Sequence, residues 1–140
     1  MSLYVDTSVL AAFYCREAGS TRAEKALRGG QALALSSLVK LELASATAKK
    51  VRNGAFDQSF ARQLLSLFHA HLRDGHFELL PVEEADVALA DEWICSLSTP
   101  LRTLDALHLA IAFRAGLTLL TADRALVTAA RALKIPCRRP

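Results

Sequence analysis

Residues 3–13 read LYVDTSVLAAF, and this stretch raises the first question about the fold. The short apolar run at 3–5 is typical of a buried strand, and the apolar residues that resume after Asp6 suggest a helix. Aspartate is almost never fully buried unless it is paired. An acid at the join between a strand and a helix therefore needs a structural or functional reason.

Short apolar runs alternate with helical patterns along the rest of the chain. Strands are predicted at 3–5, 32–35, 77–82 and 117–120, with a weaker candidate in the IPC segment near the end. Helices are predicted at 37–52, 56–73, 83–97, 103–116 and 123–133, and Asp86, Asp91 and Glu92 are expected on the polar side of the helix at 83–97. The alternation predicts a single α/β domain over 1–140, with a parallel sheet covered by helices on both faces.

Composition narrows the class of protein. Hydrophobic residues make up 52% of the chain and charged residues 22%, which indicates a packed core rather than disorder. The three cysteines are odd in number and have no CxxC spacing, so a reducing compartment is expected. No basic leader and no uncharged apolar run of about 18 residues is present, which predicts a cytoplasmic protein without a membrane span. The net charge of +3 is a mild indication of an anionic partner.

Four acids are predicted to meet at one edge of this sheet. Ligands of such folds bind beyond the carboxyl ends of the strands. Asp6 ends the first strand, and Asp123 comes shortly after the strand at 117–120. Glu42 lies in the helix that leaves the second strand, and Asp105 opens the helix that leads back to the fourth. All four carboxylates can reach the same edge.

Each of these acids also has a purely structural interpretation. Asp6 and Asp123 could cap helices, Asp105 could interact with a helix dipole, and Glu42 could be a solvated helix residue. The last interpretation fits poorly, because Glu42 shares its helix face with apolar side chains, and the same is true of Asp105. Capping alone does not explain several acids aimed at one sheet edge.

Carboxylates gathered in this way need a counter-ion. Two of them about 4 Å apart repel by roughly 4 kcal/mol at an effective dielectric constant near 20. No lysine or arginine adjoins the motifs in a way that would obviously pair them, whereas oxygen ligands suit Mg²⁺ or Mn²⁺. The hydroxyls of Thr7, Ser8 and Thr121 could orient a carboxylate or a water, or serve in ordinary turns and caps.

Four segments together are similar to a known family. YVDTSVL, SSLVKLELASA, TLDALHLAIA and LLTADRAL resemble the PIN-domain nucleases, above all the VapC toxins, over residues 2 to about 135. The resemblance implies a five-stranded parallel sheet between helices, a homodimer, an RNA substrate and a cognate VapB-like antitoxin. It also implies a catalytic and Mg²⁺-binding acidic quartet with supporting hydroxyls, which here are Asp6, Glu42, Asp105 and Asp123 with Thr7, Ser8 and Thr121.

The function that the resemblance implies is that of a Mg²⁺-dependent endoribonuclease, the toxin of a type II toxin–antitoxin system. One alternative is a PIN-like module that binds RNA or a partner without cutting. A second is a phosphatase with an aspartyl nucleophile, but that class requires another acid two residues after the first, where this chain has Ser8.

The remaining predictions concern binding surfaces and histidines. Arg102 and Arg124 adjoin the acidic motifs and are expected to contact RNA phosphates. The apolar residues of helices 37–52 and 56–73 exceed one sheet-facing stripe, notably at Leu64, Leu65, Leu67 and Phe68, which predicts a homodimer and a groove for an apolar antitoxin segment. His69, His71 and His76 are interpreted as a solvated helix end. His108 is interpreted as a packed or capping residue, with an approach to the acidic pocket as the alternative.

Overall fold

The central strand of the fold is the apolar run that precedes Asp6. The computed structural model describes residues 2–140, and in it β1 (Ser2–Val5) has strands on both sides and buries Leu3, Tyr4 and Val5 completely. Five parallel strands form the sheet in the order β3-β2-β1-β4-β5. The others are β2 (Ala32–Ser36), β3 (Glu78–Leu80), β4 (Thr118–Leu120) and β5 (Cys137–Arg138). The predicted α/β fold with a parallel sheet is confirmed.

The strand order places the expected ligand-binding position at the carboxyl ends of β1 and β4. From β1 the chain builds the sheet outward through β2 and β3, and later adds β4 and β5 on the opposite side. The order therefore reverses between β1 and β4, and open α/β sheets bind their ligands at such a reversal, beyond the carboxyl ends of the strands. Val5 pairs with Leu120 there, and the Asp6 N–H donates to the Leu120 carbonyl at 3.0 Å.

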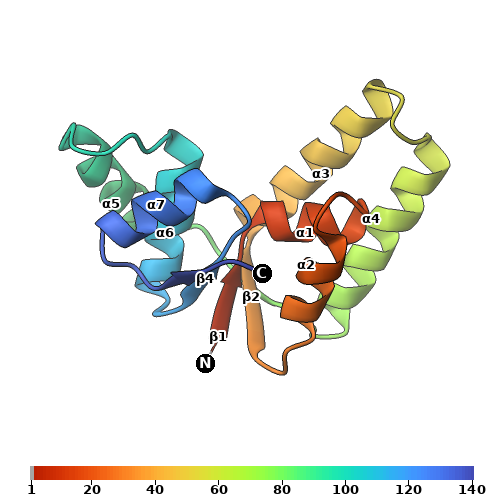
Figure 1. Cartoon of the computed structure of the whole chain (residues 1–140), viewed down its shortest axis with the longest axis horizontal. Coiled ribbons are helices and arrows are strands. Elements are labelled where there is room, and N and C mark those ends of the chain that lie inside the picture. Colours follow the sequence, from red (N-terminus) through yellow and green to blue (C-terminus); the bar gives the residue numbers. More distant parts are fainter. Residues whose placement is uncertain (1) are drawn as a thin grey trace.

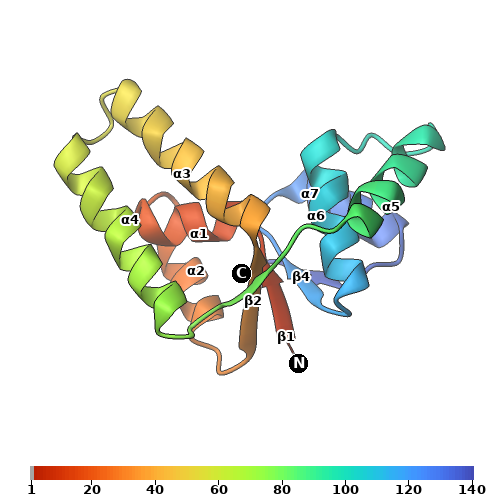
Figure 2. The same cartoon turned by 180° about the vertical axis from the view of Figure 1, so that it is seen from behind.

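Helices flank the sheet in two groups, which form the outer layers of a three-layer α/β/α arrangement (Figures 1 and 2). One group consists of α1 (Thr7–Tyr14), α2 (Ser20–Leu27), α3 (Ser37–Arg52) and α4 (Gln58–Arg73). The other consists of α5 (Glu84–Cys95), α6 (Thr103–Arg114) and α7 (Arg124–Ala132). Figure 1 shows the two groups on opposite sides of β1 and β2.

Most predicted elements are present, with ends that differ by a few residues, and α3 has the predicted bounds. The helix α2 was not predicted. Ala23, Ala26 and Leu27 face the core at helical spacing, but they are few and mostly small in an eight-residue segment, so the pattern in the sequence is weak. The strand β3 is shorter than the predicted 77–82. It is an edge strand with mostly exposed residues, and Pro81 has no N–H to extend the ladder.

The prediction that Asp86 lies on a polar helix face is wrong. Asp86 is completely buried, and both of its oxygens accept hydrogen bonds from Arg114 of α6, at 2.5 and 3.1 Å. Its Oδ2 also accepts the Glu83 N–H at 2.8 Å, which caps α5. A buried carboxylate that is paired and capped in this way joins α5 to α6 and fixes the helix that carries Asp105.

The predicted apolar surface of α4 is also partly wrong. Leu64 and Phe68 are core residues, because α4 packs against α1, and the Phe68 ring meets those of Tyr14 and Phe77. Only Leu67 of the four predicted residues is exposed, at 50%. The helix therefore offers a narrower apolar surface than its sequence suggests.

Two features bear on the environment of the chain. Cys15, Cys95 and Cys137 are all free thiols, and burial raises the pKa of Cys15. Among residues 2–140, no helix combines the length and the apolar character that a bilayer crossing requires.

Candidate active site

Asp6 lies at the carboxyl end of β1, where its side chain is 6% exposed. It occupies the N-cap position of α1, yet its side chain accepts no capping hydrogen bond from that helix. Its Oδ2 instead accepts the hydroxyls of Ser8 and Thr121, at 2.7 and 2.8 Å. The capping interpretation is therefore wrong for Asp6, and the carboxylate is held by two hydroxyls, one from the first turn of α1 and one from the segment that follows β4.

The two hydroxyls that hold Asp6 are themselves fixed by the backbone after β4. The Ser8 Oγ accepts the N–H of Ala122 at 3.0 Å, and the Thr121 Oγ1 accepts the N–H of Asp123 at 3.1 Å. Each hydroxyl thus donates to Asp6 and accepts from the loop that leads into α7. This arrangement ties the position of Asp123 to that of Asp6.

Glu42 extends from the second turn of α3 toward the same edge. Its Oε1 accepts hydrogen bonds from the Thr7 hydroxyl at 2.8 Å and from the His108 Nε2 at 2.5 Å. Burial by itself would raise the pKa of Glu42, but the hydrogen bond from His108, the charge of His108 and the bond from Thr7 outweigh it. The net effect is a lowered pKa, so Glu42 is a carboxylate at neutral pH.

Asp105 and Asp123 complete the group of acids. Burial, followed by the negative charges of Asp123 and Asp6, raises the pKa of Asp105, and His108 and Arg102 only partly offset them. Asp123 does cap its helix, because its Oδ1 accepts the N–H groups of Ala125 and Leu126 at 2.9 and 3.3 Å. Asp6 and Asp123 thus lie close enough to Asp105 for their charges to disfavour its ionised form.

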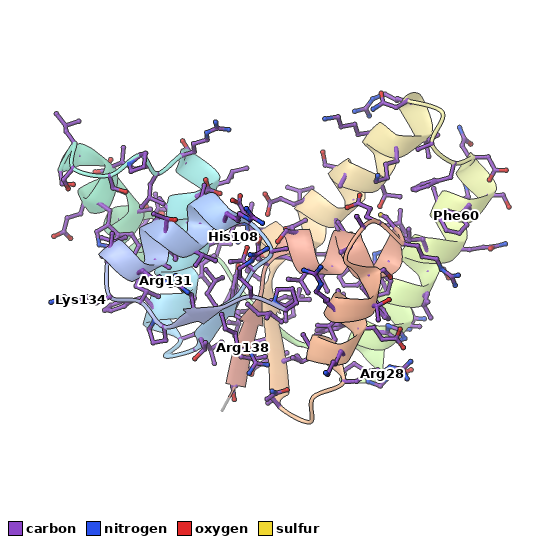
Figure 3. All side chains as sticks on the ribbon, viewed as in Figure 1. Arg28, Phe60, His108, Arg131, Lys134 and Arg138 are labelled. Atoms are coloured by element: carbon purple, nitrogen blue, oxygen red, sulfur yellow. The ribbon has the colours of Figure 1, made fainter. Side chains whose placement is uncertain are left out.

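For His108 the structure supports the alternative interpretation, an approach to the acidic pocket, rather than a merely packed or capping residue. It is 2% exposed and lies where the two groups of helices meet above the strands (Figure 3). Its Nε2 contacts Glu42 and lies 3.8 Å from the Asp6 Oδ1. Burial would lower the pKa of His108, but the bond to Glu42 and the charges of Asp6, Glu42 and Asp105 raise it overall. Its position three residues after Asp105, on the same helix face, was the available signal.

The other predicted residues lie farther from the acids or at their rim. Arg102 and Arg124 are exposed at the starts of α6 and α7, and Arg102 is near enough to influence Asp105. The histidines of 69–76 belong to another part of the molecule. The prediction of a solvated end is wrong for His71, which is half-buried and whose Nδ1 forms a 2.5 Å hydrogen bond with the Tyr14 hydroxyl.

The three hydrogen-bonded acids share one arrangement. Each of the carboxylates of Asp6, Glu42 and Asp123 accepts hydrogen bonds through only one of its two oxygens, as far as residues 2–140 are concerned. The other oxygen of each carboxylate accepts no hydrogen bond from these residues and is available to a ligand. No three acidic, histidine or cysteine side chains in this part of the chain are gathered tightly enough to hold a metal ion alone. The donors nevertheless fit Mg²⁺, because all of them are oxygens and Mg²⁺ keeps several of its waters, which can bridge to carboxylates that do not touch the ion.

Comparison with known proteins agrees with this geometry. A family model described as PIN domain matches residues 3–132. The chain belongs to the PIN-domain family. This PIN domain is also 32% identical over 136 residues to Ribonuclease VapC3 of Pyrobaculum aerophilum, which covers 97% of the chain and all of that protein.

Two solved structures share the fold at low sequence identity. VapBC2 from Rickettsia felis, bound to a promoter DNA fragment, aligns with a TM-score of 0.72 and 15% identity over 99% of this chain and 98% of that one. A toxin–antitoxin complex from Klebsiella pneumoniae aligns with a TM-score of 0.64 and 18% identity over 88% of this chain and 87% of that one. At these identities the likeness shows the fold of the PIN domain.

The crowding of the acids predicts opposite effects of two substitutions. The raised pKa of Asp105 means that its ionised form costs stability at neutral pH, so Asp105→Asn should raise the melting temperature of metal-free protein at pH 7. Asp123→Ala removes the cap of α7 and should destabilise the protein by about 1 kcal/mol. Asp123→Ser is the matched control, because it keeps a capping oxygen without the charge. A loss of stability in Asp105→Asn as large as that in Asp123→Ala would contradict the predicted repulsion.

Proposed function

We propose that this protein is an endoribonuclease, the toxin of a type II toxin–antitoxin system. It would hydrolyse RNA phosphodiester bonds at Asp6, Glu42, Asp105 and Asp123. The observation that carries the proposal is that these acids lie together where the strand order reverses. Three of them accept hydrogen bonds through only one carboxylate oxygen, which leaves the other oxygen available. Membership of the PIN-domain family and the likeness to Ribonuclease VapC3 support the same activity.

A divalent cation, Mg²⁺ or Mn²⁺, is part of this proposal. Asp6, Asp105 and Asp123 would hold it, and Glu42 would contact it directly or through a water. Once bound, the ion would neutralise the carboxylates and stabilise the negative charge that develops at the phosphate. The donor set supports this choice, since every ligand is an oxygen, and the burial and neighbouring negative charges that raise the pKa of Asp105 call for positive charge.

Hydroxyl side chains of the protein would orient the carboxylates of Asp6 and Glu42. Thr7, Ser8 and Thr121 donate to Glu42 and Asp6, so these carboxylates keep one rotamer whether or not RNA is present. Because Oδ2 of Asp6 and Oε1 of Glu42 take the hydrogen bonds, the two remaining oxygens would face the reacting phosphate and water. Such preorganisation lowers the cost of reaching the reactive geometry.

The metal dependence is tested with purified protein and a mixed RNA substrate. Cleavage should require Mg²⁺ or Mn²⁺ and stop in EDTA, and Asp6→Asn should abolish it while the protein stays folded. Cleavage by demonstrably metal-free protein would contradict the proposed site. Tight binding of RNA without cleavage under any metal would favour the alternative of a non-cutting PIN module.

Arg102 and Arg124 are proposed to hold the RNA backbone on either side of the acids. Both are exposed at helix starts next to Asp105 and Asp123. Each phosphate contact to a single strand contributes about −0.7 to the slope of log affinity against log salt.

Replacing either arginine by Ala should therefore weaken binding to varied RNA sequences by similar factors and flatten the salt slope by about that amount. Arg131→Ala, at the far end of α7, is the control and should leave the slope unchanged. If either variant changed the preferred cleavage sequence but not the slope, the arginine would be reading bases instead.

We further propose two protein partners, a second copy of the chain and a VapB-like antitoxin. Exposed apolar side chains support both, notably Leu41 of α3 at 68% and Leu67 of α4 at 50%. Leu67, Leu64, Phe60 and Phe13 line a groove of about 500 Å³ between α4 and the helices α1 and α2. The groove would accept the apolar segment of the antitoxin, and sedimentation at micromolar concentrations tests the dimer.

The antitoxin groove predicts a separation of inhibition from catalysis. Leu67→Glu places a charge in the groove without disturbing the core, so the variant should still cleave RNA but escape inhibition by the co-expressed antitoxin. Phe113→Glu makes the same change on an exposed residue of α6, outside the groove, and should remain inhibited. Equal inhibition of both variants would place the antitoxin elsewhere.

A further inference from the structure

A chain of hydrogen bonds runs through the core beneath the acids and ends at Glu42. The Ser36 Oγ at the end of β2 lies 2.7 Å from the Tyr4 hydroxyl of β1, which lies 2.8 Å from the His108 Nδ1 of α6. The His108 Nε2 then contacts the Glu42 Oε1 of α3 at 2.5 Å. Ser36 and Tyr4 are completely inaccessible to solvent, and His108 is nearly so. Four elements are therefore joined through one buried polar chain.

The direction of the last bond does not depend on the protonation state of the histidine. Glu42 is a carboxylate and can only accept, so the His108 Nε2 must carry the proton that lies between them. With a neutral ring, Ser36 donates to Tyr4, Tyr4 donates to Nδ1, and Nε2–H donates to Glu42, so that every hydroxyl proton in the chain has an acceptor. The ring orientation is thus fixed from behind by Tyr4.

A structural role accounts for Ser36, whose Oγ accepts the Val39 N–H at 3.3 Å and caps α3, but not for the Tyr4 hydroxyl or the His108 ring. Burying a hydroxyl or an imidazole costs free energy unless its hydrogen bonds are made, and apolar residues of similar size would fill the same core space without that cost. The series of hydrogen bonds begins at the N-cap of α3, and at its other end the group that it reaches is the Glu42 carboxylate. Because Thr7 and His108 both donate to Oε1, they fix the carboxylate plane from two sides and leave Oε2 available.

We propose that His108 is a positioning residue for Glu42, and that Tyr4 and Ser36 hold its ring in place. The inference rests on the proposed ribonuclease function, in which Glu42 acts at the phosphate. The groups behind a functional carboxylate commonly affect activity by about 10- to 100-fold, because they set its orientation and basicity. The whole set, including Thr7, would then select one Glu42 rotamer before substrate binds.

Kinetics on a small set of variants test this role. His108→Leu removes the donor at similar volume and should lower kcat roughly 10- to 100-fold with little change in KM, since the predicted RNA contacts are elsewhere. His108→Gln, whose amide N–H can replace Nε2–H, should recover part of the loss. Tyr4→Phe should cause a smaller decrease in kcat. A wild-type kcat in His108→Leu, or no recovery in His108→Gln, would overturn the proposal.

The protein contains a second tyrosine–histidine pair that serves as a matched control. Tyr14 and His71 form a second tyrosine–histidine hydrogen bond, of 2.5 Å, between α1 and α4. Neither residue bonds to an acid of the site. Tyr14→Phe therefore removes the same chemical group as Tyr4→Phe and should keep the wild-type kcat. An equal loss in the two variants would show that the effect is a general consequence of weakening the core.

Proton NMR of the metal-free protein tests the geometry without any reaction. An imidazole N–H that is buried and bonded to a carboxylate exchanges slowly and should give a resolved downfield resonance. This resonance should vanish in His108→Leu, shift in Glu42→Gln and Tyr4→Phe, and remain unchanged in Tyr14→Phe. If the wild-type protein cleaves no RNA, the proposed function fails, and the spectrum alone then decides whether His108 positions Glu42. A wild-type spectrum without the resonance would overturn the positioning role.

Discussion

The burial of the Asp6 carboxylate is the constraint around which this site is built. A carboxylate at 6% exposure must be compensated, and the compensation comes from Ser8 and Thr121. Thr121 is within reach only because β4 pairs with β1 in the observed register. The hydroxyls in turn fix the backbone that presents Asp123. One buried charge therefore links the strand pairing at the centre of the sheet to the position of the last acid.

The helix α6 serves the fold at one end and the site at the other. Near its start it presents Asp105 and His108 to the acids, and at its last residue Arg114 forms the bidentate pair with the buried Asp86. Breaking a buried pair by removing one partner typically costs about 3–5 kcal/mol, so α6 is held firmly against α5. The rigid attachment at the far end explains how a residue of α6 can reach the α3 carboxylate with hydrogen-bond accuracy.

The sequence predicted the parts of the fold that depend on local pattern. The buried strand at 3–5, the helix at 37–52 and the meeting of the four acids follow from apolar periodicity and from the polarity of parallel strands. Asp86 and Phe68 were misplaced because their burial depends on partners, Arg114 and Tyr14, that periodicity does not reveal. His108 shares a helix face with Asp105, but its role depends on Tyr4, which is 104 residues away. Pairings over such separations are set by tertiary packing.

The strand order also determines when the site can exist during synthesis. Its parts come from both ends of the chain, so Asp6 and Glu42 emerge from the ribosome long before Asp105 and Asp123. Neither β4 nor the hydroxyl of Thr121, which follows Asp6 by 115 residues, is available to Asp6 when the first strands emerge. Long-range pairings of this kind form late, because the loop must close before the contacts stabilise it. A nascent chain therefore carries an incomplete set of acids until the segment that holds Thr121 and Asp123 has been made.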